Sequence, residues 1–307
     1  MIVVAGEALV DLVVDTDGSV VAKLGGGPYN VARTIGRLGG VVSFLGAVSN
    51  DRFGCELLTQ LVADGVTTDA TVRTDRPTTL AAAELNDRGA ATYRFYLEGT
   101  SAPSLDVVPA TIVTPTAVHL GTLGLVLEPM ASTLLGYLHT LPADTLVMLD
   151  PNCRAGVIAN RDAYVRRVDA AYERADVVKI SNDDAEYLAP GVDPLDYARS
   201  LVRRGVSLIL VTWGADGTWV VTADHKELVP TQPVVVADTI GAGDSFGGGF
   251  LSWWLDAGFG RGELSDPALA VHATAAAQEV AGITCQRPGA DPPRRADLSA
   301  DWARVKR

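Results

Sequence analysis

Short apolar runs alternate along most of the chain with segments whose apolar residues recur at helical spacing. The runs have the continuous hydrophobicity of strands buried on both faces of a parallel sheet, and they lie at residues 2–5, 41–48, 146–149, 176–180 and 207–212. Helical spacing is found at residues 53–61, 130–141 and 267–281. This alternation of strand and helix predicts an α/β fold with a central, mostly parallel sheet.

One segment breaks this alternation. Residues 78–85 and 91–96 have the every-second-residue apolar pattern of half-buried strands, and Asn-Asp-Arg-Gly between them is a hairpin turn sequence. A hairpin inserted in an α/β chain is a candidate lid, and we expect it to share a small sheet with residues 10–14. The lid strands are therefore predicted within residues 8–23 and 78–96.

The chain has 307 residues, enough to bury about three quarters of its unfolded surface in a single domain spanning residues 1–307. Its 37 acidic and 25 basic residues give a net charge of −12, which disfavours binding to nucleic acids or anionic membranes. The three cysteines are scattered and the four histidines stand apart, which argues against structural zinc and a disulfide framework. With no basic leader pattern and no apolar run of ~18 residues, the sequence predicts a cytoplasmic protein.

The chemistry is predicted at residues 238–250, Asp-Thr-Ile-Gly-Ala-Gly-Asp-Ser-Phe-Gly-Gly-Gly-Phe. Gly241, Ala242 and Gly243 are small enough to bring backbone N–H groups close to an anion, and a helix is predicted to follow them. The N-terminus of a helix has free N–H donors and the positive end of the helix dipole, which suits a phosphate in transfer. Asp244 in the first turn is placed to take a proton from a hydroxyl that attacks phosphorus.

An isolated glycine turn often does no more than reverse the chain. The turn at residues 241–243 is not the dinucleotide fingerprint, because Phe246 stands where that motif needs its third glycine. The sequence contains no Gly-Lys-Ser or Gly-Lys-Thr, which excludes a Walker A loop. An NAD-dependent oxidoreductase is therefore disfavoured.

A second glycine cluster, Gly-Gly-Gly-Pro-Tyr-Asn-Val-Ala, occupies residues 25–32 and leads into a predicted helix. Pro28 suits a first helical turn, and Asn30 offers both a donor and an acceptor to hydroxyl groups. The same cluster also fits an ordinary loop before a helix. Asp11 interrupts an apolar strand, where an acid lies either at a solvent-facing edge or in a site.

Further polar groups follow other predicted strands. Asp-Pro-Asn-Cys-Arg at residues 150–154 comes at the carboxyl end of a strand, where α/β sheets bind ligands, although it can also form an ordinary turn. The acidic residues after the strand at 176–180 fit a helix cap or a magnesium site. Residues 212–217 fit a hairpin turn or the edge of a nucleotide site, and the small side chains at 267–281 fit an adenine ring or core packing.

Residues 238–246 resemble the C-terminal signature of the PfkB, or ribokinase-like, family of carbohydrate kinases, Asp-Thr-x-Gly-Ala-Gly-Asp-x-Phe, and match it completely. Residues 25–32 resemble the N-terminal signature of that family, Gly-Gly-x-x-x-Asn-x-Ala, when Gly25 and Gly26 are taken as its diglycine. Gly-Glu-Ala-Leu-Val-Asp at residues 6–11 is most similar to the bacterial fructokinases within the family. The resemblance covers essentially the whole chain and implies a ribokinase-like three-layer fold with a small β lid.

By this resemblance, Asp244 is the catalytic base, and it forms the anion hole together with Gly241, Ala242 and Gly243. The substrate contacts of the family fall on the first glycine cluster, the lid and the run after residue 149, at Asp11, Gly25, Gly26, Asn30, Arg94, Tyr96 and Arg154.

The resemblance also implies ATP and Mg²⁺ as cofactors. The nucleotide contacts of the family fall on Lys179, Thr212, Gly214, Gly217, Ala273 and Ala276. Its Asn-x-x-Glu magnesium motif is matched in relaxed form by Ser181 and Asp184, so Asp184 would position Mg²⁺ through water. Many members also bind K⁺ near the closing loop, but Pro293 stands where a ribokinase has a hydroxyl ligand, and this chain therefore departs from the K⁺ pattern.

These signatures predict an ATP-dependent sugar kinase that phosphorylates a primary hydroxyl of a ketose, with D-fructose as the first choice. A 2-keto-3-deoxygluconate kinase is the near alternative, followed by a ribose or nucleoside kinase. A non-catalytic sugar- or nucleotide-binding module is the alternative of another class, and the intact Asp244 argues against it. In this family an exposed lid sheet often becomes a dimer contact, so a homodimer through the lid is also implied.

Overall fold

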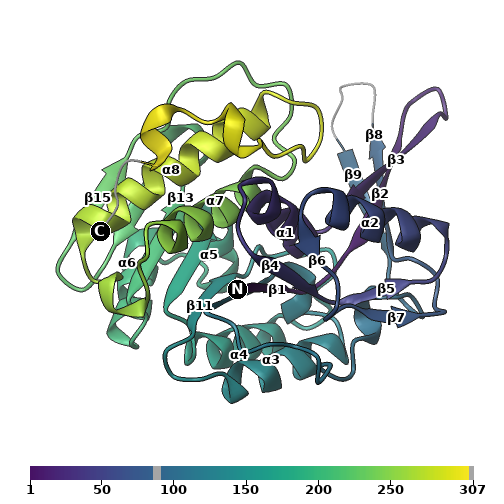
Figure 1. The fold of residues 1–307 in the computed structure, drawn as a ribbon, viewed down its shortest axis with the longest axis horizontal. Coiled ribbons are helices and arrows are strands. Elements are labelled where there is room, and N and C mark those ends of the chain that lie inside the picture. The colour runs from purple at the N-terminus through teal and green to yellow at the C-terminus, as the bar shows by residue number, and fades with distance from the viewer. Residues whose placement is uncertain (86–90, 304–307) are drawn as a thin grey trace.

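A nine-stranded sheet forms the centre of the computed structural model, which describes residues 1–85 and 91–303 (Figure 1). The strand order is β15-β14-β13-β12-β11-β10-β1-β4-β6. Neighbouring strands from β13 to β6 are parallel, and β14 and β15 are added antiparallel at one edge. The strand bounds are β1 (Ile2–Ala5), β4 (Val42–Leu45), β6 (Val66–Thr67), β10 (Ala117–Gly121), β11 (Leu146–Asp150), β12 (Val177–Ser181), β13 (Leu208–Thr212), β14 (Thr218–Val221) and β15 (Lys226–Val229).

Helices cover both faces of this sheet, because alternate strand residues face two separate apolar cores. In β1, Val4 packs in one core with Tyr29 and Trp254, whereas Val3 packs in a second core with Leu134. The predicted three-layer α/β fold is confirmed. The helix bounds are α1 (Gly27–Arg37), α2 (Arg52–Ala63), α3 (Met130–Thr140), α4 (Arg161–Tyr172), α5 (Asn182–Leu188), α6 (Pro194–Arg203), α7 (Ala242–Asp256) and α8 (Pro267–Cys285).

A four-stranded lid stands beside the main sheet (Figure 1). Its strand order is β3-β2-β8-β9, with bounds β2 (Leu9–Val14), β3 (Val20–Gly25), β8 (Leu80–Leu85) and β9 (Ala91–Tyr96). The hairpin of β8 and β9 joins the sheet through the parallel pair of β2 and β8, as predicted. The turn predicted at residues 86–89 lies outside the described residues.

The apolar run at residues 41–48 forms two strands rather than the one predicted. It ends as β4 at Leu45, and β5 (Ala47–Ser49) then pairs with β7 (Val72–Thr74) in a small parallel sheet. Gly46 separates the two strands at a crowded point, where a Cβ atom would lie 2.4 Å from the backbone oxygen of Gly6. Apolar periodicity does not reveal such a close backbone approach, which only glycine permits.

The topology brings the functional segments to one edge of the main sheet. The loops after β1, β10, β11 and β12 all leave the sheet at the carboxyl ends of parallel strands, and the N-terminus of α7 and the lid lie beside them (Figure 1). Ligands of open α/β sheets bind at this edge. Across residues 1–85 and 91–303, no helix is long and apolar enough to cross a membrane.

Candidate active site

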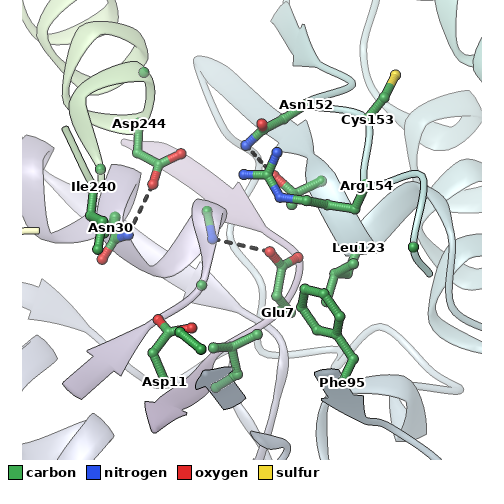
Figure 2. A pocket seen from close by; sticks show the side chains of 18 of the residues that line it. Glu7, Asp11, Asn30, Phe95, Leu123, Asn152, Cys153, Arg154, Ile240 and Asp244 are labelled. Carbon is green, nitrogen blue, oxygen red and sulfur yellow. Dashed lines mark hydrogen bonds between the residues drawn. The ribbon is translucent and has the colours of Figure 1, made fainter. Parts of the chain in front are cut away.

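A cavity of about 630 Å³ lies where the lid, the sheet edge and the start of α7 meet (Figure 2). Each of these parts contributes polar lining. Glu7 and Lys179 come from the sheet edge, Asp11 comes from lid strand β2, Asn30 comes from α1, and Asp244 comes from α7. Two apolar side chains, Phe95 from β9 and Leu123 from the loop after β10, complete the wall across the cavity from Asn30 and Asp11 (Figure 2).

Asp244 is buried in the first turn of α7 and accepts a hydrogen bond of 2.9 Å from the Asn30 side-chain amide. Burial raises the pKa of the Asp244 carboxyl, and the Asn30 hydrogen bond and the nearby Lys179 and Arg154 charges act in the opposite direction. The carboxyl group is thus both accessible from the cavity and more basic than an exposed aspartate. These are the properties of a general base for a hydroxyl group.

The glycine turn before Asp244 opens α7 as predicted. Gly241 is the N-cap in a left-handed conformation, with φ of 75°, and a Cβ atom on it would lie 2.6 Å from the side chain of Ala290. A Cβ atom on Gly243 would lie 3.0 Å from Lys179 Nζ. Gly241 and Gly243 line the cavity, whereas Ala242 is not among its lining residues in the described part of the chain.

Lys179 places a fixed positive charge beneath this turn. Its Nζ donates to Asp150 Oδ2 over 2.8 Å, and both side chains are buried. Burial lowers the pKa of Lys179, but the neighbouring Asp150, Asp184 and Asp244 raise it by more. Burial also raises the pKa of Asp150 to about 6, against the effect of Lys179. The helix N-terminus and a lysine therefore converge on one place where a phosphoryl group can be held.

The first glycine cluster reaches the cavity through Gly26 and Gly27, not through Gly25. Gly25 is the last residue of β3, and a Cβ atom on it would lie 2.3 Å from Asp11 Oδ2. It makes room for the Asp11 side chain instead of facing a ligand. Asp11 itself lines the cavity, and burial, reinforced by the charge of Asp244, raises its pKa to about 6.

The lid places Phe95 in the cavity wall, whereas Arg94 and Tyr96 are not among the described residues that line the cavity, so their contact with substrate stays a prediction. The Arg94 guanidinium is paired with Glu84 at 3.0 Å with its side chain 64% exposed, and Tyr96 is 56% exposed. Successive residues of a strand point to opposite faces, so a strand that turns residue 95 inward turns both of its neighbours outward.

Arg154 lines the cavity, and its predicted contact with substrate stays a prediction; the loop that carries it and the segment after β10 have unusual backbone conformations. Thr122 and Asn152 both have positive φ, 50° and 40°, and the Asn152 amide donates to Thr122 Oγ1 over 3.2 Å. Such conformations are costly for residues other than glycine and concentrate at functional sites. Thr122 carries no motif signal and was not predicted, whereas Asn152 belongs to the Asp-Pro-Asn-Cys-Arg run at residues 150–154.

The predicted nucleotide residues other than Lys179 lie away from this cavity, as far as the described residues show. Thr212, Gly214 and Gly217 surround the turn between β13 and β14, where Gly214 and Gly217 have φ of 53° and 126°. Ala273 and Ala276 pack in the apolar core instead, and Ala273 has no exposed surface. The backbone oxygen of Ala276 accepts a hydrogen bond from Trp302, so the core explanation applies to this helix.

Asp184 forms a helix cap, the other role that its sequence allowed. Its Oδ2 accepts from the backbone and hydroxyl of Ser181 at 2.9 and 2.7 Å, and its Oδ1 accepts from the Cys153 backbone at 2.6 Å. Both carboxylate oxygens thus accept hydrogen bonds from the protein, and the contact of Asp184 with Mg²⁺ through water stays a prediction. Within the described residues there is no group of three or more His, Cys, Asp or Glu that could hold a metal.

A parallel sheet with a β lid, and a buried carboxylate at a glycine-opened helix beside a lysine, define a phosphotransferase of the ribokinase-like class. The model of the pfkB family of carbohydrate kinases matches residues 1–296, and the chain belongs to this family. The predicted family and carbohydrate kinase activity are confirmed, and the enzyme transfers a phosphoryl group to a sugar hydroxyl.

Curated relatives and solved structures agree with this assignment. The chain is 33% identical over 258 residues to a fructokinase of Rhizobium leguminosarum bv. trifolii, covering 82% of this chain and 79% of the relative. It is 31% identical over 310 residues to probable fructokinase-4 of Arabidopsis thaliana, covering 95% and 93%. Among solved structures, it is similar to a fructokinase with bound ATP from Xylella fastidiosa, at 27% identity, a TM-score of 0.85 and coverage of 94% and 93%.

A second solved structure carries both a sugar and a nucleotide. The fructokinase from Vibrio cholerae O395, in its fructose, ADP and calcium ion bound form, is 25% identical to this chain with a TM-score of 0.82, and the match covers 94% of both chains.

Proposed function

We propose that this carbohydrate kinase is an ATP-dependent fructokinase, which transfers the γ-phosphoryl group to a primary hydroxyl of D-fructose. The observation that carries the proposal is the hydrogen bond between Asn30 and Asp244 inside the polar cavity. This bond joins the Asn30 amide, which can bind hydroxyl groups, to Asp244, the general base. Asp244 lies in the first turn of α7, where the helix N-terminus can bind an anion. The curated relatives described as fructokinases support fructose as the acceptor, and the structures that hold ATP or ADP support the nucleotide.

In the reaction, a primary hydroxyl of the sugar approaches the γ-phosphorus of ATP while Asp244 accepts its proton. The bond from the sugar oxygen to phosphorus forms, the bond from phosphorus to the bridging oxygen of ADP breaks, and ADP departs. The N–H groups of Gly241 and Gly243 and the ammonium of Lys179 stabilise the charge on the transferring group, whereas the N–H of Ala242 donates to the Thr239 backbone oxygen over 3.2 Å. The fixed positions of these groups supply the orientation on which phosphoryl transfer depends.

The sugar is held by groups that pair with hydroxyls. Asp11 accepts hydrogen bonds from the lid side, and Asn30 lines the cavity with a side-chain oxygen that is buried and has no hydrogen-bond partner among the described residues. The backbone at Gly26 allows close approach, and Arg154 stands on the opposite wall.

For the nucleotide, the turn carrying Thr212, Gly214 and Gly217 is proposed to receive ATP. Mg²⁺, held by the phosphates of ATP, would neutralise charge on the group in transfer. K⁺ dependence is not part of the proposal, because Pro293 departs from the family pattern.

We also propose a homodimer through the lid and a cytoplasmic location. The exposed Val20 and Val21 on β3 favour the dimer contact.

One observation favours a second acceptor. Arg154 lines the cavity and has no ion-pair partner among the salt bridges of the described residues, so it could pair with the carboxylate of 2-keto-3-deoxygluconate. The experiment must therefore separate these two sugars.

The test is ADP release from MgATP with D-fructose, 2-keto-3-deoxygluconate, D-ribose and adenosine, each measured with and without K⁺. The matched blank is Asp244→Asn, which keeps the size of the side chain and removes the base. We expect turnover on fructose and a loss of about 10²- to 10⁴-fold in kcat for Asp244→Asn, with little change in stability. Turnover on another acceptor alone would overturn the choice of fructose, and an active Asp244→Asn enzyme would overturn the role of Asp244.

A further inference from the structure

Glu7 is a buried carboxyl group in the cavity wall that the mechanism above leaves without a role. It lies two residues beyond the end of β1 and is 1% exposed, yet it lines the cavity. Its Oε1 accepts a hydrogen bond of 3.0 Å from the backbone N–H of Gly27, at the start of α1. Its Oε2 is buried and has no hydrogen-bond partner in the structure. One half of the carboxyl group is therefore satisfied by the protein and the other half is not.

The charges that face Glu7 come from three elements. Asp244 on α7 and Asp11 on β2 line the same cavity, and Arg154 in the loop after β11 is the facing cation (Figure 2). A third ionised carboxyl beside Asp11 and Asp244 would repel both of them and an incoming phosphate group. A neutral carboxyl avoids this repulsion and gains a proton that it can donate.

The local energetics agree with a neutral group. Burial raises the pKa of Glu7 to about 8, and the charge of Asp244 adds to this rise. The hydrogen bond from Gly27, the nearby backbone N–H of Glu7 itself and the charge of Arg154 lower the pKa by only part of this rise. At neutral pH the protonated form predominates.

We propose that Glu7 is a sugar-binding residue, which holds the start of α1 through Oε1 and donates a hydrogen bond from a protonated Oε2 to a hydroxyl of the substrate. The inference rests on the proposed function, because it needs a sugar in this cavity. Its chemistry complements the other acids of the site. Asp11 and Asp244 accept protons or hydrogen bonds from sugar hydroxyls, whereas Glu7 supplies a donor to a hydroxyl oxygen.

The decisive comparison is Glu7→Gln against Glu7→Ala. In Glu7→Gln the amide oxygen still accepts from Gly27 and the amide NH₂ replaces the donor, so KM for the sugar at pH 7 should stay within about threefold of wild type. In Glu7→Ala both bonds are lost, and KM should rise by about tenfold or more. Circular dichroism and urea unfolding check that both variants fold. An equal rise of KM in the two variants would mean that Glu7 acts as an ionised acceptor. A wild-type KM in Glu7→Ala would mean that Glu7 does not contact the sugar. Either result would overturn the proposal.

The pH dependence of KM gives a result that a purely structural role would not produce. In wild type, KM should rise as the pH passes about 8, because ionised Glu7 can no longer donate. In Glu7→Gln this alkaline rise should be absent, since the amide does not titrate there. The same alkaline rise in both proteins would assign it to another group and overturn the proposal.

Infrared difference spectra of wild type minus Glu7→Gln separate this inference from the choice of fructose, because they need no substrate. We expect the carbonyl band of a protonated carboxyl group in wild type at pH 7, which disappears at alkaline pH. Absence of that band would overturn the proposal even if fructose is phosphorylated. Presence of the band together with no turnover of fructose would overturn the proposed acceptor and leave the protonated Glu7 established.

Discussion

Asn30 and Asp244 are 214 positions apart in the sequence, and a hydrogen bond of 2.9 Å joins their side chains. The bond uses the amide nitrogen of Asn30, and the amide oxygen has no hydrogen-bond partner in residues 1–85 and 91–303. It also connects α1, which follows the lid, to α7, which carries the glycine turn. One amide thus links the sugar side of the cavity to the base that activates the sugar.

Replacement of Asn30 by Ala should shift the pH profile of the enzyme. The Asn30 hydrogen bond lowers the pKa of Asp244 against the effect of burial. Without it the pKa of Asp244 rises further, more of the base is protonated at a given pH, and the acid limb of kcat/KM should move to higher pH. Profiles of kcat/KM for fructose from acid to neutral pH test this, with Asn182→Ala as the matched control because the Asn182 amide makes an exposed hydrogen bond to its neighbour Asp183. An acid limb that stays in place would show that Asn30 does not tune the base.

Gly241→Ala should damage catalysis in a way that backbone strain alone does not explain. The new Cβ would meet Ala290 at 2.6 Å, so the glycine turn must shift away from the geometry that holds the phosphoryl group. Gly258, just beyond the other end of α7, has a similar φ of 82° and nothing within 4 Å of a new Cβ. Both alanines cost about 1–2 kcal/mol of stability for the left-handed conformation. Only Gly241→Ala should also lower kcat. We expect a decrease of about tenfold or more, because the shifted turn loses a contact to the transferring group. Equal kcat values in Gly241→Ala and Gly258→Ala would contradict this prediction.

Lys179→Met should destabilise the protein by about 3–5 kcal/mol, because it leaves the buried Asp150 without its partner. The deficit should grow with pH. The folded pKa of Asp150, about 6, is already above its ordinary value and rises further without Lys179. An acid with a raised folded pKa contributes stability at low pH that is lost as the pH rises through that pKa. Urea unfolding at mildly acidic and alkaline pH measures this, and Lys226→Met is the control, since that lysine lies over the Trp219 ring. A deficit that shrinks at alkaline pH would refute the coupling.

The sequence predicted the order of elements and the two glycine turns because both depend on local patterns. Apolar periodicity gave the strands and helices, and a helix after residues 241–243 follows from small residues before a breaker-free segment. The position of Asp244 relative to that helix follows from chain order alone. The contact of Asp244 with Asn30 does not, because it depends on how α1 and α7 pack.

The predicted site residues differ from the residues that line the cavity where a sequence pattern allows two answers. Strand alternation shows that residue 95 faces opposite to residues 94 and 96, but not which face turns to the main sheet. Small residues in α8 suit a ligand or a neighbouring helix equally. In the structure α8 packs against α7, and Ala273 and Ala276 lie in the apolar core. Glu7 lay in a quoted motif, but its burial and its bond to Gly27 become visible only in three dimensions.

Phe95→Ala should weaken sugar binding without affecting the chemical step. Phe95 contributes an apolar face to the cavity wall opposite Asp11, and it does not reach the glycine turn (Figure 2). Losing that face should raise KM for fructose roughly fivefold, equivalent to about 1 kcal/mol, and leave kcat nearly unchanged. Tyr96→Ala removes a similar ring from the exposed side of the same strand, so its KM should equal that of wild type. Steady-state kinetics of the two variants decide which face of β9 contacts the substrate. A KM increase in Tyr96→Ala with none in Phe95→Ala would mean that the strand presents its other face to the sugar when the lid closes.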